Sequence, residues 1–305
     1  MKIPIFTDEP GWQGAQLQQA FAKHDVEAVF VSLQDCLIDL SQSAASIVIP
    51  GFSCLPQAAF VRGVAGGTLQ QVITRLNVLH MLQRMGMRVY NQPQAIERTV
   101  DKAMTSFLLR QHGVMTPATW VAESRAQITA LRSTIAGQYP LLVLKPLFGS
   151  QGKGVRLLQT EDTLPVPMLQ HVDGVYYLQQ FIRSAQSSHD YRVMVVAGRA
   201  VAAMKRQGAS WVNNVASGGQ CERVELSQTL LSQTLALLAV RAAEAVQIDY
   251  CGVDIIQAES GEFYVLEVNS IPAWRGLQSV TDFNIAELLV KDLLNKLSIQ
   301  ENLAV

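Results

Sequence analysis

The sequence predicts an α/β protein whose first third is a parallel sheet and whose remainder is of the α+β type. Through residues 1–98, short apolar runs alternate with helical patterns, which is typical of a parallel sheet with helices between its strands. In residues 246–275, two apolar runs flank a polar turn, which is the pattern of an antiparallel β-hairpin. The 305 residues, 49% hydrophobic and 16% charged, can build cores for two or three domains and disfavour large disordered regions.

Composition argues against several classes of protein. The net charge is −1 and no basic blocks occur, so we expect no nucleic-acid partner. The first ten residues meet acid and proline before a signal-peptide core could form, and no apolar run has membrane length. The four cysteines contain no Cys-x-x-Cys pair, which argues against a zinc site and a disulfide framework. We therefore expect a soluble cytoplasmic protein with no membrane partner.

The first unit has marked element boundaries. Thr68 followed by Gln71 is a capping-box signature, and Gly86 stops the helix that begins there. The apolar stripe predicted for this helix is Leu69, Val72, Ile73, Leu76, Leu79 and Leu82. The predicted strands are residues 3–6, 29–33, 47–49 and 87–90, with a first helix opening after Gly11 and Trp12.

Two loops of this unit are candidates for ligand contact. The loop 7–14 follows the first strand, and open α/β sheets bind ligands at the carboxyl ends of their strands. Trp12 and Gln13 could therefore line a substrate site, although an ordinary surface loop fits them equally well. Arg62 lies in a glycine-rich stretch whose backbone approaches either a ligand or only the next helix.

Lys102 opens the next helical pattern, which runs through Leu109. The dipole of a helix disfavours a cation in its first turn, so a bound anion would explain this lysine. The alternative is that Lys102 bends into water and pairs with Asp101 or Glu97. Further strands are predicted at 118–121, 141–145, 155–158, 176–182, 192–196 and 200–204, and further helices at 227–246 and 285–293.

A glycine-rich loop joins the strands 141–145 and 155–158. Its three glycines, Gly149, Gly152 and Gly154, would let backbone N–H groups approach phosphate oxygens, and Lys145 stands at the end of the preceding strand. The loop is not a Walker P-loop, because the Gly-Lys-Ser/Thr element is absent and the loop joins strand to strand. A flexible turn without any ligand has the same sequence pattern.

The hairpin in residues 246–275 brings carboxylates together. A two-residue loop at Ser260 and Gly261 would place Asp254 opposite Glu267, and Asn269 on the same face two residues later. Opposed Cβ atoms lie roughly 5 Å apart, where like charges repel. Carboxylate and amide oxygens suit Mg²⁺ shared with substrate phosphates. The alternative is a solvated acidic patch on an exposed hairpin.

Asp254 with Glu267-Val268-Asn269 resembles the metal-binding signature of the ATP-grasp superfamily, and residues 270–278 resemble the RimK-type ligases. The tetrahydromethanopterin:glutamate ligase branch is the most similar branch. This resemblance implies an N-terminal Rossmann-like pre-ATP-grasp domain (1–98) and a two-subdomain ATP-grasp fold. The small subdomain (99–180) would carry the phosphate lid, and the large subdomain (181–305) would carry the metal site.

The resemblance also implies roles for individual residues. The metal would be Mg²⁺, with Mn²⁺ as a substitute and two ions expected, bound by Asp254, Glu267 and Asn269. Catalysis would rest on Arg206 and Asn214 at the triphosphate and the transferred phosphoryl group. The ATP-binding residues would be Lys102, Lys145, Gly149, Ser150, Gln151, Gly152, Gly154, Gln179, Gln180, Phe181, Ile182, Asp190 and Arg192.

Some positions depart from the family or have another explanation. Gln180 stands where a glutamate is common, and its amide can still hydrogen-bond to the adenine. Asp190 and Arg192 match family positions, but they could instead form a local ion pair. Val212 and Ser217 replace arginines of the RimK-like chains that modify protein, which indicates a different substrate.

The activity implied is ATP-dependent ligation of a carboxylate to an amine through an acylphosphate. The resemblance suggests L-glutamate as the amine and a small carboxylate acceptor, such as a tetrahydromethanopterin-type coenzyme. Arg62, Arg275 and Asn213 are candidates for the donor carboxylates. Trp12, Trp211 and Trp274 are candidates for an aromatic acceptor site.

Two alternatives stay open at this point. One is a RimK-like glutamate ligase that modifies the C-terminus of a ribosomal protein, and the other is a non-catalytic regulatory module that binds ATP and Mg²⁺. The resemblance also suggests a homo-oligomer, since related enzymes are often dimers or tetramers.

Overall fold

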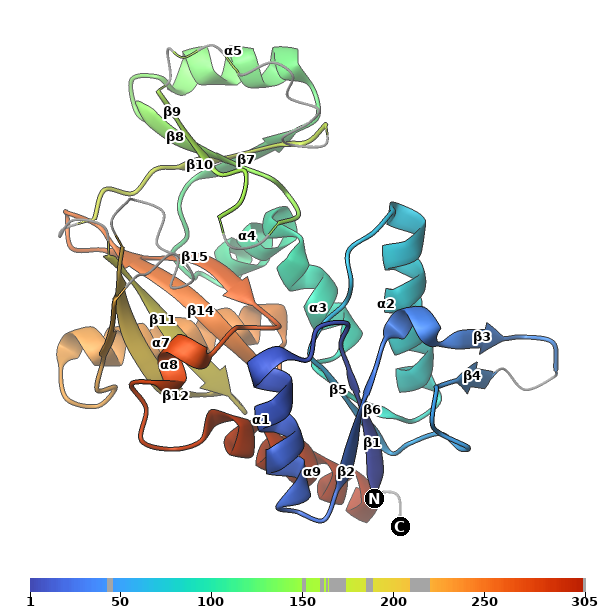
Figure 1. The fold of residues 1–305 in the computed structure, drawn as a ribbon. Coiled ribbons are helices and arrows are strands. Elements are labelled where there is room, and N and C mark those ends of the chain that lie inside the picture. Colours follow the sequence, from blue (N-terminus) through green and yellow to red (C-terminus); the bar gives the residue numbers. More distant parts are fainter. Residues whose placement is uncertain are drawn as a thin grey trace.

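The N-terminal unit is a parallel four-stranded sheet with strand order β2-β1-β5-β6 (Figure 1). Its strands are β1 (Lys2–Phe6), β2 (Glu27–Val31), β5 (Ala58–Val61) and β6 (Arg88–Tyr90). The chain leaves β1 for β2 on one side and returns to pair β5 with the other side of β1. The predicted parallel sheet is therefore confirmed, and the strand order reverses between β1 and β5.

One strand of this sheet differs from the prediction. The predicted strand 47–49 forms β4 (Ser46–Val48), which pairs with β3 (Leu37–Asp39) in a separate antiparallel hairpin. The strand beside β1 is β5, a short Ala-Ala-Phe-Val run that is buried throughout. Two alanines make β5 a weak strand by propensity, so its burial between β1 and β6 decides its conformation.

Helices cover both faces of this sheet. Leu17 and Phe21 of α1 (Gly11–Ala22) and Leu289 of α9 (Ile285–Leu303) pack on one face. On the other face lie α2 (Leu69–Arg84) and α3 (Pro93–Val100). The C-terminal helix thus returns to the N-terminal sheet, where α9 contacts α1 (Figure 1).

The capping box of α2 is confirmed, because Gln71 N–H donates to Thr68 Oγ1 and Thr68 N–H donates to Gln71 Oε1. The predicted apolar stripe is wrong in its first half, since Leu69 is 71% exposed and Ile73 is 46% exposed. The buried face of this half carries Arg75, whose Nη1 donates to the carbonyl oxygens of Ala65 and Gly66. The segment 63–67, which precedes α2, thus covers this half of the helix through polar contacts.

The middle of the chain forms a second, antiparallel sheet, called here the small sheet, with strand order β7-β10-β8-β9. Its strands are β7 (Thr119–Ala122), β8 (Leu141–Lys145), β9 (Arg156–Gln159) and β10 (Tyr176–Gln180). The helix α5 (Arg125–Ile135) packs on it around Ile128, Leu142 and Leu178. This layer has its own core and lies above the other sheets in Figure 1.

The last part of the chain forms the large sheet, with strand order β13-β12-β11-β14-β15. Its strands are β11 (His189–Val196), β12 (Arg199–Gln207), β13 (Gln220–Arg223), β14 (Tyr250–Gln257) and β15 (Phe263–Asn269). One face packs on α7 (Leu230–Val246) and α4 (Lys102–Gln111). The other face shares a core with the N-terminal sheet, α9 and the short helix α8 (Arg275–Gln278).

The β14–β15 hairpin confirms the predicted pairing of Asp254 with Glu267 by an unexpected route. Near the turn, Phe263 pairs with Gln257, where the prediction had Ala258. A β-bulge between Asp254 and Ile255 then restores the predicted register, with Leu266 as the extra residue. The bulge therefore decides which residue faces Asp254.

The structure, a computed structural model, describes residues 1–42, 46–149, 152–159, 162, 164, 174–184, 189–208 and 220–303. Across these residues, no helix is both long and apolar enough to cross a membrane.

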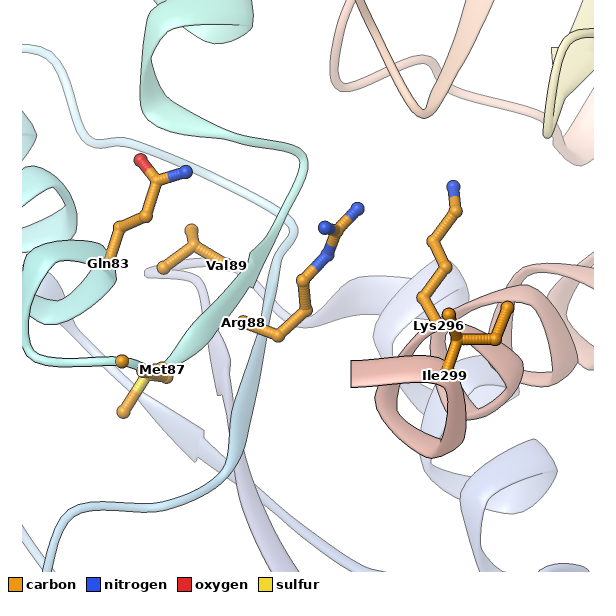
Figure 2. A pocket seen from close by; sticks show the side chains of 7 residues that line it. Gln83, Met87, Arg88, Val89, Lys296 and Ile299 are labelled. Carbon is orange, nitrogen blue, oxygen red and sulfur yellow. The ribbon is translucent and has the colours of Figure 1, made fainter. Parts of the chain in front are cut away.

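A pocket between α2, β6 and α9 is lined by Gln83, Gly86, Met87, Arg88, Val89, Lys296 and Ile299 (Figure 2). It opens at the first residue of β6, opposite the carboxyl ends of the parallel strands, and its two cations both pair with Asp249, at 2.8 and 2.7 Å.

Candidate active site

The candidate site begins where one face of the large sheet changes from apolar to polar. Alternate residues of β11 share a face, so Val196 and Met194 of the shared core continue into Arg192 and Asp190. The same change occurs on β14 from Tyr250 to Asp254. Strand register aligns these polar positions across the sheet, because Asp190 pairs with Arg206, Arg192 pairs with Asp254 and Asp254 pairs with Glu267.

Two arginine–carboxylate pairs are buried at this place. Arg206 donates from Nε and Nη2 to the two carboxylate oxygens of Asp190, at 2.7 and 2.8 Å. Arg192 makes the same bidentate contact with Asp254, with Nε donating to Oδ1 and Nη2 donating to Oδ2 at 2.8 Å. Arg206 also lies 3.1 Å from Asp254 Oδ1 and links the two pairs. The partners therefore lie across strands, and the local Asp190–Arg192 pair is not the arrangement found.

These arginines keep Asp254 ionised. Burial alone would raise the pKa of Asp254, but the charges of Arg192 and Arg206 outweigh it and hold that pKa at about 2. A carboxylate offers roughly four lone-pair sites, and the arginines take three of them. The side chain of Glu267 is a further hydrogen-bond partner of Asp254.

Glu267 and Asn269 form the other half of the proposed metal site. Asn269 Nδ2 donates to Glu267 Oε1 at 3.0 Å, so the two side chains share a face as expected. Among the described residues, no group of three His, Cys, Asp or Glu side chains is arranged for a metal. Two carboxylates and an amide oxygen are a donor set that suits Mg²⁺ when phosphates complete its coordination.

Two lysines from other elements come near these carboxylates, Lys102 of α4 and Lys145 of β8. The charge of Glu267 acts on both Lys102 and Lys145. Burial is the largest effect on each lysine, and it lowers the pKa of Lys102 and lowers the pKa of Lys145 to about 8. The structure thus brings Lys102, Lys145, Glu267 and Asp254 to one place from four separate elements.

Lys102 holds the glycine-rich loop directly. Its Nζ donates to the carbonyl oxygens of Leu147 and Gly149, at 3.1 and 3.0 Å. Asp101 instead caps α4 by accepting from Ala103 N–H, and Glu97 pairs with His80. The alternative of a lysine paired with either acid is therefore not found.

The glycine-rich loop needs glycine at a specific position. Gly154 has φ of +76°, and an added Cβ would lie 2.7 Å from Pro146 Cγ. Gly152 also has positive φ, and its carbonyl oxygen accepts from Val155 N–H to close the turn. Ser150 and Gln151, predicted as phosphate contacts, lie outside the described residues, as do Asn213, Asn214, Trp211, Val212 and Ser217.

A polar network behind Lys145 was missed by sequence reasoning, which assigned Gln179 to the nucleotide. Lys145 Nζ donates to Gln179 Oε1 at 2.6 Å. Gln179 is 1% exposed, and its Nε2 donates to Tyr177 Oη and Thr119 Oγ1. The signal available in the sequence was strand alternation, because Tyr177 and Gln179 share a face of β10, and Tyr177 pairs with Lys145.

The linker from β10 to β11 was expected to offer backbone groups to adenine. The N–H of Gln180 donates to Ala118 O at 2.7 Å, and the N–H of Phe181 donates to Leu141 O at 3.1 Å. Gln180 Oε1 also accepts from Ala118 N–H. Ile182 is buried beside them. These two N–H groups are therefore already bonded within the protein, and an adenine edge would have to bind other backbone groups of this segment.

One aromatic expectation needs correction. Trp274 is 1% exposed and packs in the shared core, so it cannot offer a free ring face to a pterin. The guanidinium of Arg62 covers its ring at 5.1 Å from the ring centroid. Trp12 is half-buried, and Arg275 lies 6.0 Å from its ring centroid.

Comparison with known families decides what this arrangement belongs to. The model of the RimK-like ATP-grasp domain matches residues 99–293. The chain belongs to the RimK-like ATP-grasp family. As a member of this family of ADP-forming ligases, it is an enzyme that binds ATP.

Similar RimK-like chains align along almost the full length. The tetrahydromethanopterin:α-L-glutamate ligase of Methanococcus maripaludis is 30% identical over 303 residues, covering 97% of this chain and 98% of the relative. A probable α-L-glutamate ligase of Pseudoalteromonas atlantica is also 30% identical over 303 residues, covering 98% and 96%.

Solved structures share the ATP-grasp fold. The ATP-grasp ligase PsnB, complexed with a minimal precursor, has a TM-score of 0.73 at 20% identity, covering 96% of this chain and 98% of PsnB. D-cycloserine synthetase DcsG has a TM-score of 0.72 at 18% identity, covering 97% of this chain and 100% of DcsG. PsnB has also been solved with Mg and ADP. These likenesses show that this RimK-like chain has the predicted ATP-grasp fold.

Proposed function

We propose that this ligase joins L-glutamate to a small carboxylate acceptor of the tetrahydromethanopterin type. The observation that carries this proposal is the similarity over 97% of the chain to a ligase named for that reaction. The candidate site supports the phosphate chemistry, because two lysines, two carboxylates and an amide meet at the end of the shared core.

The residues divide the work by charge. The ammonium groups of Lys102 and Lys145 bind phosphate oxygens, and Arg206 with Asn214 stabilises charge on the transferring phosphoryl group. Asp254, Glu267 and Asn269 hold Mg²⁺, which we propose as two ions. When bound there, Mg²⁺ supplies charge neutralisation between the phosphates. Asp190 orients Arg206 through its two-pronged contact.

The reaction has two steps. An oxygen of the acceptor carboxylate attacks the γ-phosphorus of ATP, ADP leaves, and an acylphosphate forms. The neutral amine of glutamate then attacks the acyl carbon, phosphate leaves, and an amide remains. The glycine-rich loop, held at Gly149 by Lys102, closes over the phosphates and excludes water from the acylphosphate. We propose three domains for this reaction. Residues 1–98 form the pre-ATP-grasp domain, residues 99–180 carry the phosphate lid, and residues 181–305 carry the metal site.

The direct test is ADP release from ATP and Mg²⁺ over a grid of amino acids crossed with carboxylate acceptors. The grid includes a pterin coenzyme precursor and ribosomal protein tails. We expect turnover only with L-glutamate and the pterin. Turnover with a protein tail would replace the acceptor, and tight ATP binding without turnover on any pair would favour a regulatory module.

Glu267→Ala tests the metal assignment. We expect this change to abolish ADP release, because the metal loses a carboxylate and Asn269 loses its partner. The thermal midpoint should change little, since Glu267 is only half-buried. Glu259→Ala is the matched control, as Glu259 is an exposed carboxylate at the turn of the same hairpin. ADP release by Glu267→Ala at the rate of the control would refute the metal site.

A further inference from the structure

Three loops meet at the carboxyl end of the N-terminal sheet. The order of its strands reverses between β1 and β5, and open α/β sheets bind ligands at such a switch point. Thr7 follows β1 and Arg62 follows β5, and the N–H groups of Arg62 and Gly63 both donate to Phe6 O. The segment that leaves Asn269 of the metal strand reaches the same place, because Arg62 Nη1 donates to Ile271 O at 3.4 Å.

Arg62 carries a half-buried charge at this junction. Its guanidinium lies over the ring of Trp274, and burial lowers its pKa. Within the described part of the chain, Arg62 has no carboxylate partner. A half-buried guanidinium without a counter-ion is unfavourable, and a ring face compensates for it only in part.

A second arginine repeats this arrangement from the other side of the junction. Arg275 opens α8 directly after Trp274, and its guanidinium lies over the ring of Trp12 in the first turn of α1. Arg275 is exposed, and the ion pairs of the described residues do not include it. Two arginines are therefore each stacked on a tryptophan ring, and neither pairs with an acid among the described residues.

We propose that Arg62 and Arg275 form the subsite that binds the amine substrate through its two carboxylates. The proposal rests on the proposed function, and it specifies the substrate class as an amino acid with an acidic side chain. Arginine presents paired N–H donors that match a carboxylate, and stacking on an aromatic ring fixes the plane of those donors.

The position of the subsite suits the amine and not the acceptor. The acceptor carboxylate must lie at the transferring phosphate, beside Lys145 and Arg206. Arg62 contacts the backbone two residues beyond Asn269, so a ligand held there would approach the acylphosphate from the N-terminal sheet. The alternative is that the two arginine–tryptophan contacts only join the N-terminal sheet to the large sheet. That alternative predicts a loss of stability without a loss of affinity.

The test is calorimetric titration of L-glutamate into the full chain saturated with ADP and Mg²⁺. We expect Arg62→Gln and Arg275→Gln each to weaken glutamate binding by about ten- to a hundredfold, the range for hydrogen bonds to charged groups. L-glutamine should bind the unmodified protein more weakly than L-glutamate. Any change of tryptophan fluorescence that glutamate causes should be smaller in Trp12→Phe, which keeps Trp274 under Arg62.

Two control variants and the ADP affinity show whether the loss is specific to glutamate. Arg84→Gln removes an exposed arginine from the last turn of α2 and should bind glutamate normally. Arg62→Lys keeps a cation but loses the paired donors, and it should fall between Arg62→Gln and the unmodified protein. ADP affinity should stay the same in every variant.

The outcomes distinguish this subsite from the proposed function. Unchanged glutamate affinity in Arg62→Gln and Arg275→Gln overturns the subsite and leaves glutamate ligation intact. If the unmodified protein binds aspartate or 2-aminoadipate in place of glutamate, and the arginine variants lose that binding, the subsite stands and the glutamate assignment fails. If no acidic amino acid binds while ADP does, the subsite is overturned.

Discussion

At the scale of single residues, Lys145 shows how burial tunes the pKa of a lysine that we propose binds phosphate. It stands at the end of β8, half-buried, with its ammonium donating to Gln179 and close to the charge of Glu267. Burial lowers its pKa to about 8, and the nearby charge of Lys102 adds to that effect. A bound triphosphate would raise the same pKa, so binding and protonation are linked.

The sign of this linkage gives a pH dependence. Below pH 8 the ammonium is present, and ATP affinity should be constant. Above pH 8 the free protein loses this proton, so ATP affinity should fall by up to about tenfold per pH unit. Titration of ATP binding from pH 6.5 to about 9.5 measures this, because the window brackets the lowered pKa.

Two variants check the assignment to Lys145. Lys145→Arg keeps its charge over this window, so its ATP affinity should fall less with pH than that of the unmodified protein. Lys145→Ala should bind ATP weakly at every pH. An unmodified protein with constant affinity up to the top of the window, or a Lys145→Arg variant with the same decline, would contradict the prediction.

At the scale of elements, the β14–β15 hairpin places the carboxylates by close packing. Arg192 reaches Asp254 by crossing Gly252, where an added Cβ would lie 3.0 Å from Arg192 Nη1 and 3.0 Å from Pro272 Cβ. Glycine at this position therefore makes room for the arginine between two strands. The same row of the sheet continues to Asn269, which pairs with Gly252.

Gly252→Ala should displace Arg192 from Asp254. We expect the variant to fold with a loss of about 1–3 kcal/mol in the free energy of unfolding, the usual cost of overpacking. ADP release should fall more steeply, because Asp254 loses the cation that fixes its position. Urea unfolding and ADP release measure the two effects. Gly198→Ala is the control for loss of a glycine, because an added Cβ meets nothing there, although its φ of +70° adds strain. Normal ADP release by Gly252→Ala would show that the close approach is unimportant.

At the scale of the whole molecule, Asn91 joins the N-terminal sheet to the β14–β15 hairpin. Its side chain is fully buried, and Nδ2 donates to Tyr250 O and Ser270 O, both at 2.8 Å. Oδ1 accepts from the N–H groups of Asp249 and Tyr250. One amide thus bonds to the start of β14 and to the residue after Asn269.

Asn91→Ala leaves those four backbone groups without their partner. With about 1–3 kcal/mol for each unsatisfied buried group, and some recovered by water, we expect the free energy of unfolding to fall by about 3–5 kcal/mol. The Mg²⁺ concentration needed for half-maximal ADP release should rise, because Ser270, next to Asn269, loses its hydrogen bond to Asn91. Chemical unfolding and a Mg²⁺ titration measure this. Asn77→Ala, on the exposed side of α2, should change stability by less than about 0.5 kcal/mol. Equal stability of the two variants would contradict the role of Asn91.

The sequence by itself determined the features that depend on local pattern. The capping box of Thr68 and Gln71 could be read because its partners are three residues apart. The pairing of Asp254 with Glu267 could be read because a hairpin connects neighbouring strands, although the bulge at Leu266 was invisible to period-two alternation. Lys102 was recognised as anomalous from the helix dipole, before the structure joined it to Gly149.

Only the tertiary structure decided the partners that come from distant segments. Asp190 and Arg192 stand two residues apart, yet they pair with Arg206 and Asp254, because strand order sets those neighbours. The short strand β5 is specified by burial between β1 and β6, which no local propensity records. Arg62 lies over Trp274 because the packing of the N-terminal sheet against the large sheet brings these distant residues together. Sequence patterns fix which face a side chain takes, while the order of strands in a sheet, set by the packing of the whole core, fixes what it faces.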